Sequence, residues 1–172
     1  HDLGQAYQAI DRLHEAGLIY DAHIMTGVAG KGRGMENAEA LAQFLNRTNP
    51  AHVVNFSMFL HKEVPLYEDI RQGTFVPADE LETIREEYHL IERIAPEKAG
   101  ANILYDGFHD FIHVRVRGHL PGDKEKMLAK LSGIIQEYEG KEPVYSFVQG
   151  ECPDLEYCDD GKAVWDMDRK TS

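Results

Sequence analysis

The sequence has few cysteines, little positive charge and no long apolar run. Two cysteines in 172 residues cannot form a disulfide framework, which favours a reducing, cytoplasmic setting. No apolar run approaches the ~18 residues that a membrane-spanning helix needs, so the sequence predicts no membrane partner. The 18 lysines and arginines against 30 acidic residues give a net charge of −12, which argues against nucleic acids and anionic membranes as partners.

Helical and strand patterns alternate along the chain, whose length is typical of one domain. Apolar residues at helical spacing predict helices at about 3–16, 36–47, 66–72, 79–94 and 127–138. Apolar runs, and strict alternation in the last case, predict strands at about 19–26, 52–60 and 107–120. Because a helix joins the first two strands, these strands form a right-handed parallel unit. The pattern therefore predicts an α/β fold.

Four glycines, Gly27, Gly30, Gly32 and Gly34, follow the first predicted strand and precede a predicted helix. Glycine permits positive φ and a close approach of backbone to ligand, and the first turn of a helix has free amide donors. The segment matches neither a Walker motif nor a dinucleotide-binding fingerprint. It predicts a cradle for a charged ligand at the carboxyl end of the sheet, and the alternative is an ordinary flexible turn.

Basic residues alternate with apolar ones along the predicted strand at 107–120. One side of this strand carries His113, Arg115, Arg117 and His119. Guanidinium and imidazole groups suit the carboxylates or phosphates of a substrate, and the alternative is a solvated face paired with glutamates. We expect no metal site there, because His109 and His113 would lie roughly 13 Å apart on a strand.

Two cysteines, Cys152 and Cys158, stand near the end of the chain among acidic residues. They could bind zinc together with carboxylates. No histidine lies near them in the sequence, and acidic neighbours raise the pKa of a thiol and lower its reactivity. The alternative is a pair of incidental surface cysteines.

Several segments, in their order and spacing, resemble one known family. They are Ala9–Gly17, the strand that leads into Thr26-Gly27-Val28-Ala29-Gly30, Phe56–Leu60 with Val64–Tyr67, and Gly118–Lys126. Together they are similar to the second half of a radical S-adenosylmethionine domain. The nearest branch is the group of iron–sulfur proteins similar to oxygen-independent coproporphyrinogen oxidase. The likeness covers roughly residues 5–135.

The resemblance implies a partial β/α barrel in which a Cys-x3-Cys-x2-Cys loop holds a [4Fe–4S] cluster and S-adenosylmethionine binds the fourth iron. This chain lacks that loop, and two thiolates cannot hold a four-ligand cluster. The chain enters a helical pattern directly after His1, so we expect a fragment that is inactive alone, with the cluster ligands in another part of the parent protein. The resemblance further implies that cofactor-binding residues of the family correspond here to His23, Ile24, Met25, Thr26, Gly27, Ser57 and Leu60.

We therefore expect residues 1–96 to be the C-terminal portion of a partial TIM-like barrel and residues 97–172 to be an α+β appendage with an acidic tail. The expected role is part of the cofactor wall and of the cavity for a small-molecule substrate. Two alternatives stay open. One is a non-catalytic α/β module that binds a small anionic ligand through the glycine loop or the basic strand. The other is a fragment that self-associates through exposed sheet edges.

Overall fold

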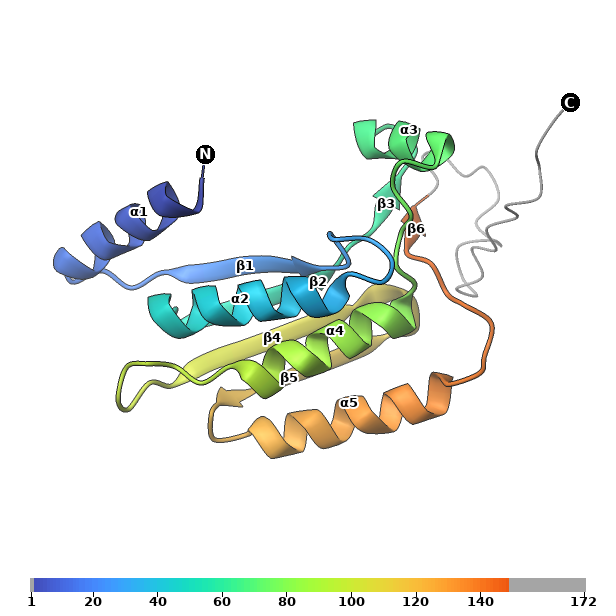
Figure 1. Cartoon of the computed structure of the whole chain (residues 1–172). Coiled ribbons are helices and arrows are strands. Elements are labelled where there is room, and N and C mark those ends of the chain that lie inside the picture. Colours follow the sequence, from blue (N-terminus) through green and yellow to red (C-terminus); the bar gives the residue numbers. More distant parts are fainter. Residues whose placement is uncertain (1, 149–172) are drawn as a thin grey trace, which may run out of the picture.

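A four-stranded sheet with helices packed on one face forms the body of the protein (Figure 1). The structure is a computed structural model and describes residues 2–148. Its helices are α1 (Leu3–Glu15), α2 (Gly34–Thr48), α3 (Pro65–Gln72), α4 (Glu80–Arg93) and α5 (Lys124–Tyr138). Its strands are β1 (Asp21–Thr26), β2 (His52–Ser57), β3 (Leu60–His61), β4 (Ile103–His109), β5 (Val114–Leu120) and β6 (Phe147–Val148). These elements confirm the predicted α/β fold.

The main sheet has the strand order β1-β2-β4-β5. Its first three strands are parallel, and β5 runs antiparallel to β4. The predicted parallel unit of β1, α2 and β2 is confirmed. The carboxyl ends of β1, β2 and β4 therefore meet at one edge, where Thr26, Ser57 and His109 lie. A separate pair of short strands, β3 and β6, is parallel.

One face of the main sheet carries the core. Helix α4 packs between α2 and α5 against this face, which Figure 1 shows behind the three helices. Side chains of α4 and of the strands that are fully shielded from solvent include Val53, Ile84, Ile91, Ile103 and Val116. Because neighbouring residues of a strand point to opposite faces, the residues between these core positions point away from the helices.

The opposite face has no helix among the described residues, and we call it the bare face. Strand register places on it Asp21, His23, Met25, His52, Val54, Phe56, Leu104, Asp106, Phe108, Arg115, Arg117 and His119. Only Asp106 among them is buried; the others are half-buried or exposed. Parallel strands in α/β proteins are normally covered on both faces, so an apolar centre such as Phe56 and Phe108 is unusual on an uncovered sheet.

Local sequence explains where the central helix begins. Asp79 has extended backbone, and its side chain accepts a hydrogen bond from the Glu82 amide at 2.8 Å. This contact satisfies one of the amides that a helix start leaves without a partner. The start that the spacing of these two residues predicts is therefore confirmed.

Two predicted strands are broken in the structure. The prediction of one strand over 107–120 was wrong, because β4 ends at His109 and a 3-10 turn, Asp110–Ile112, leads into β5. The chain reverses there to form an antiparallel hairpin, and His113 takes a left-handed conformation with φ of 52°. Its side chain therefore leaves the predicted alternation. The predicted strand at 52–60 likewise divides into β2 and the short β3.

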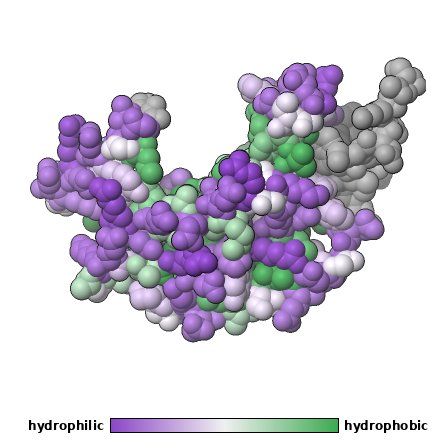
Figure 2. All heavy atoms as spheres, in the orientation of Figure 1, coloured by the Kyte–Doolittle hydropathy of each residue, from purple (hydrophilic) through white to green (hydrophobic). Residues whose placement is uncertain are grey.

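The described residues form an open sheet and not a closed barrel. Strands β4 and β5, which follow the expected boundary at residue 97, complete the same sheet as β1 and β2. Strands β1 and β5 lie at its two edges, so self-association through an edge stays a prediction. Figure 2 shows a mainly hydrophilic surface with a hollow between α1 and α3 and hydrophobic surface beneath α3. Among the described residues, no helix combines the length and apolar character needed to cross a bilayer.

We expect Ile84→Ala to lower the free energy of unfolding by about 2–5 kcal/mol, because it leaves a cavity beneath α4. Ile19→Ala is the matched control: Ile19 is 82% exposed, so its loss changes stability by less than about 0.5 kcal/mol. Urea unfolding followed by circular dichroism measures both values. Equal effects of the two substitutions would contradict the placement of α4 at the centre of the core.

Candidate functional site

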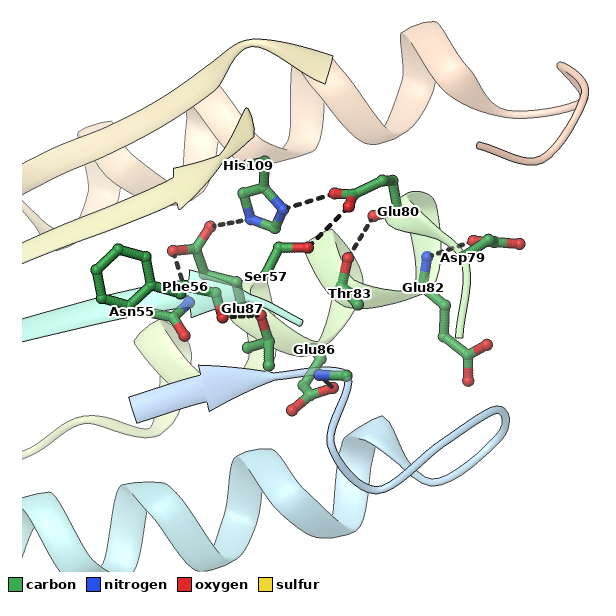
Figure 3. Close-up of polar contacts among 12 residues, drawn as sticks. Asn55, Phe56, Ser57, Asp79, Glu80, Glu82, Thr83, Glu86, Glu87 and His109 are labelled. Carbon is green, nitrogen blue, oxygen red and sulfur yellow. Dashed lines mark hydrogen bonds and ion pairs between the residues drawn. The ribbon is translucent and has the colours of Figure 1, made fainter. Parts of the chain in front are cut away.

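Buried charged groups gather at the carboxyl edge of the sheet, between α4 and the strands (Figure 3). Helix α4 supplies Glu80, Glu86 and Glu87, which are at most 2% exposed, and β4 supplies His109, which is fully buried. Burying charges is costly unless they are paired and hydrogen-bonded. The contacts of these four side chains therefore decide whether this edge of the fold can form.

His109 lies between two carboxylates of α4. Its Nδ1 is 3.1 Å from Glu80 Oε2, and its Nε2 is 3.0 Å from Glu87 Oε2. Burial alone lowers the pKa of an imidazole, but the hydrogen bonds and charges of the two glutamates outweigh burial and raise the pKa of His109 to about 9. The imidazole is therefore protonated at neutral pH, and both ring nitrogens donate.

The remaining oxygens of the two carboxylates accept hydrogen bonds from side chains of β2 and β4. Glu80 Oε1 accepts from Ser57 Oγ at 2.8 Å, and Glu87 Oε1 accepts from Tyr105 at 2.9 Å and from Asn55 Nδ2 at 3.1 Å. Burial, and next the charge of Glu87, raise the pKa of the Tyr105 hydroxyl well above its ordinary value, so it stays a neutral donor.

This cluster lacks the arrangement of a serine hydrolase. An activated serine donates to the imidazole that removes its proton, whereas Ser57 donates to a carboxylate and His109 binds glutamates on both sides. The hydrogen-bonded chain from Ser57 to Tyr105 ties β2 and β4 to α4. The role of these contacts is therefore structural, and we call this set of hydrogen-bonded residues between α4 and the strands the clamp.

Glu86 makes the corresponding link to β1. Its Oε2 accepts from the Gly27 amide at 2.9 Å, and its Oε1 accepts from Asn37 Nδ2 at 2.5 Å. Burial raises the pKa of Glu86, while the hydrogen bonds from Asn37 and Gly27 oppose that rise. All three parallel strands are therefore attached to α4 at their carboxyl ends.

The bare face carries a second polar arrangement. Arg115 binds Asp106 through two hydrogen bonds, of 2.8 and 2.6 Å, and its guanidinium lies 4.7 Å from the centre of the Phe108 ring. Phe108 stacks with Phe56 at 5.7 Å between ring centres. The hydrogen bonds from Arg115 lower the pKa of Asp106 despite its burial. The Nε of Arg117 is 3.6 Å from the same carboxylate, and that side chain is 56% exposed.

The structure places the predicted substrate-binding residues on two different elements. Arg115, Arg117 and His119 share the bare face, as predicted from their alternation. His113 lies in the turn before β5, because the chain reverses there. The cluster is also less basic than its sequence indicates, since Asp106 neutralises Arg115. Arg117 is the member whose guanidinium is most available to a ligand.

The predicted cofactor-binding residues lie in the carboxyl half of β1 and directly after it, at the end of β2, and in β3. Those in the main sheet have side chains on both of its faces. His23 and Met25 are on the bare face, whereas Ile24, Thr26 and Ser57 alternate toward the helices. Thr26 Oγ1 donates to the Phe56 carbonyl at 3.3 Å, and Ser57 is held by Glu80. Leu60 is buried in β3, which pairs with β6. Two of these side chains, His23 and Met25, thus have surface on the bare face for a ligand.

The described residues contain no group of three or more side chains suited to holding a metal ion. Cys152 and Cys158, the only cysteines of the chain, lie outside the described residues. This chain does not supply the thiolate set that a [4Fe–4S] cluster needs. The fit to S-adenosylmethionine is confined to packing surface, because the polar groups of Thr26, Gly27 and Ser57 already bind protein atoms.

The glutamate cluster was absent from the sequence-based prediction. Its signal is the polar set Glu80, Thr83 and Glu87, which lies at helical spacing on the core side of α4. A second signal is Asn55 and Ser57 at alternate positions of a strand that otherwise reads as apolar. Each signal alone is ambiguous. Only the fold shows that both sets point to His109.

The raised pKa of His109 predicts a pH-dependent stability. The protonated imidazole contributes fully to the free energy of unfolding below about pH 6.5, and this contribution is lost as the pH rises through about 9. The reason is that the folded state binds this proton more tightly than the unfolded state does and releases it only at the higher pH. We expect His109→Gln to cost roughly 3 kcal/mol near pH 6 and much less near pH 10. Urea unfolding of the wild-type protein and of His109→Gln across this pH range measures the difference in their free energies of unfolding. A difference that stays constant with pH would contradict a charged His109.

Gly107 makes room for Glu87, because a Cβ at residue 107 would overlap the Oε1 atom. We expect Gly107→Ala to destabilise the protein by at least about 2 kcal/mol, since the carboxylate must leave His109 or Tyr105. Gly133→Ala in α5 is the matched control: its Cβ meets nothing within 4 Å, and alanine favours the helix by up to about 1 kcal/mol. Thermal unfolding should move in opposite directions for the two variants. Destabilisation by both would contradict the assignment.

Comparison of the chain with protein-family models, with curated proteins and with solved structures found no match.

Proposed function

We propose that this chain is the second half of a partial β/α barrel in a radical S-adenosylmethionine enzyme. In this role it supplies part of the wall that surrounds the cofactor and part of the substrate cavity. Its parent protein would be an oxidoreductase similar to the oxygen-independent coproporphyrinogen oxidases. The chain alone is then inactive, because the cluster ligands are not in it.

The bare face is the observation that supports this proposal most. In a β/α barrel all helices lie outside, and the other face of the sheet turns inward. Here β1, β2 and β4 are parallel, their helices share one face, and the opposite face keeps Phe56 and Phe108 half-buried without a covering element among the described residues. This is the arrangement expected of a barrel segment whose interior face is completed by other strands and by ligands.

The cofactor side of the proposal concerns the end of β1. In the family that the sequence resembles, S-adenosylmethionine on a [4Fe–4S] cluster supplies radical hydrogen abstraction. The residues of this chain would orient the nucleoside: Met25 and His23 offer packing surface on the bare face. Thr26, Gly27 and Ser57 would act indirectly, because their hydrogen bonds fix the strand ends to each other and to α4.

The substrate side of the proposal concerns β5. Asp106 holds Arg115 in a fixed orientation over Phe108, and Arg117 and His119 follow on the same face. A guanidinium beside aromatic rings binds carboxylates or phosphates of a ligand that also packs on the rings. His113 can contribute only from the turn that precedes the strand.

A second candidate function is a non-catalytic module that binds a small anionic ligand through β5. The exposed guanidinium of Arg117, with one long contact to Asp106, favours this version. The version that uses the glycine loop lacks such support, since the Gly27 and Gly32 amides already donate to carboxylates. Titration of this chain with citrate tests the module: saturable binding that Arg117→Ala abolishes would favour it.

The radical-enzyme proposal is tested with the whole protein that the gene encodes, reconstituted anaerobically with iron and sulfide. We expect a [4Fe–4S] electron paramagnetic resonance signal that changes on addition of S-adenosylmethionine. Met25→Arg should weaken that binding by at least about tenfold, because a charged side chain would project from the bare face. Met35→Arg, at an exposed methionine of α2, is the matched control. Absence of a cluster, or equal effects of the two variants, would refute the proposal.

A further inference from the structure

The carboxyl half of the bare face is an apolar surface with positive charge at its border. Met25, Phe56 and Phe108 lie in one row across β1, β2 and β4, and Arg115 of β5 ends the row. The rings of Phe56 and Phe108 stack at 5.7 Å, and these rings and Met25 are half-buried. Parallel strands in α/β proteins are normally covered on both faces. A further layer of side chains on this row would therefore remove apolar surface from water.

Positive charge exceeds negative charge at this border. Arg115 and Arg117 share one carboxylate, Asp106, and their side chains are 52% and 56% exposed. The Nζ of Lys130 on α5 adds a third positive charge at the edge of the sheet, where it donates to the Arg115 carbonyl at 2.6 Å. Asp21 is the other carboxylate that register places on the bare face, and it lies at the amino end of β1, on the opposite edge. An acidic group placed beside β5 would therefore meet positive charge that is not yet balanced.

The sequence that follows the described residues has the complementary composition. Residues 149–172 include seven acidic and three basic residues, together with Trp165, the one tryptophan of the chain. Trp165 and Met167 each stand directly before an aspartate, Asp166 and Asp168. An indole packs favourably against aromatic rings and beside guanidinium groups. The apolar and acidic side chains of this segment therefore suit a surface of stacked phenylalanines with arginines at its border.

The position of β6 places the start of this segment close to the same surface. Strand β6 ends at Val148, and its Phe147 pairs with Leu60 of β3. Leu60 follows Phe56 by four residues, so the Cα atoms of these two residues lie within about 14 Å of each other. Residues 149–165 can span up to about 55 Å, whereas a four-stranded sheet is less than about 20 Å wide. The segment is therefore long enough to bring Trp165 to any point of the bare face.

We propose that residues 149–172 cover the carboxyl half of the bare face, with Trp165 on the Phe56–Phe108 pair and neighbouring carboxylates beside Arg117. A second copy of the chain fits less well, because its bare face has the same excess of positive charge. An anionic ligand would have to displace the segment to reach Arg117. The inference does not rest on the proposed function, because it concerns only contacts within this chain.

The test uses the two cysteines of the chain, Cys152 and Cys158, which both belong to this segment. Cys152 is replaced by serine, a nitroxide is attached to Cys158, and the methionine methyl groups carry ¹³C. A nitroxide broadens nearby methyl resonances, and the effect falls steeply with distance. We expect loss of the Met25 resonance on the bare face and retention of the Met127 resonance, because Met127 is buried on the helix-covered side of the sheet.

Arg117→Glu, made in the labelled chain, reverses the charge beside which the carboxylates are proposed to lie. We expect it to lower the ratio of covered to uncovered protein at least about fivefold, which is measured as the return of the Met25 resonance. Arg12→Glu is the matched control, because it makes the same change of charge at an exposed position of α1 and should leave the Met25 resonance broadened.

Three results would overturn the proposal. The first is a Met25 resonance that stays as sharp as that of Met127 in the labelled chain. The second is a Met25 resonance that stays broadened in Arg117→Glu. The third is broadening that passes from a nitroxide-labelled copy to a separate ¹³C-labelled copy, which would assign the bare face to a second molecule. None of these results bears on cluster assembly in the whole protein, so the two proposals fail separately.

Discussion

The position of His109 between Glu80 and Glu87 is the constraint on which the carboxyl edge of the sheet depends. A buried imidazolium with two carboxylates is costly to desolvate, and a well-packed apolar cluster of the same size is often at least as stable. The contribution of these charged groups is to fix where α4 lies on the sheet. Each carboxylate has a second oxygen that binds a strand, so the position of α4 along the sheet is fixed by groups that match in only one register.

This clamp separates the roles of the two faces of the sheet. Polar residues of β2 and β4 that point toward the helices, such as Ser57, Asn55 and Tyr105, form hydrogen bonds that hold α4. Residues that point the other way lie on the bare face, where Asp106 orients Arg115 beside Phe108. The helix-covered face is thus fixed by buried polar contacts, whereas the bare face carries apolar and basic side chains that are half-buried or exposed, apart from the buried Asp106.

Local signals made much of the fold predictable. Asp79 with Glu82, the apolar stripes of the helices, and Gly27 after a strand predicted the helices, the parallel β1-α2-β2 unit and the loop. The hairpin was missed because the alternation that begins at Ile112 was extended back to Gly107, and only the pairing of His109 with Val114 shows where the chain reverses. The site was harder to predict than the fold, because nothing in the local sequence around Glu80, Glu87 or His109 distinguishes that residue from an ordinary surface residue.

The sequence by itself determined what depends on near neighbours: helix starts, strand alternation, the conformational freedom of the glycine loop and the shared face of Arg115 and Arg117. The tertiary structure decided which partner each polar group meets. In this fold the Gly27 and Gly32 amides donate to Glu86 and Glu82. Asp106 binds Arg115 closely and Arg117 through one longer contact. The physical reason is that charge and hydrogen-bonding capacity belong to a residue, whereas their satisfaction depends on groups tens of residues away.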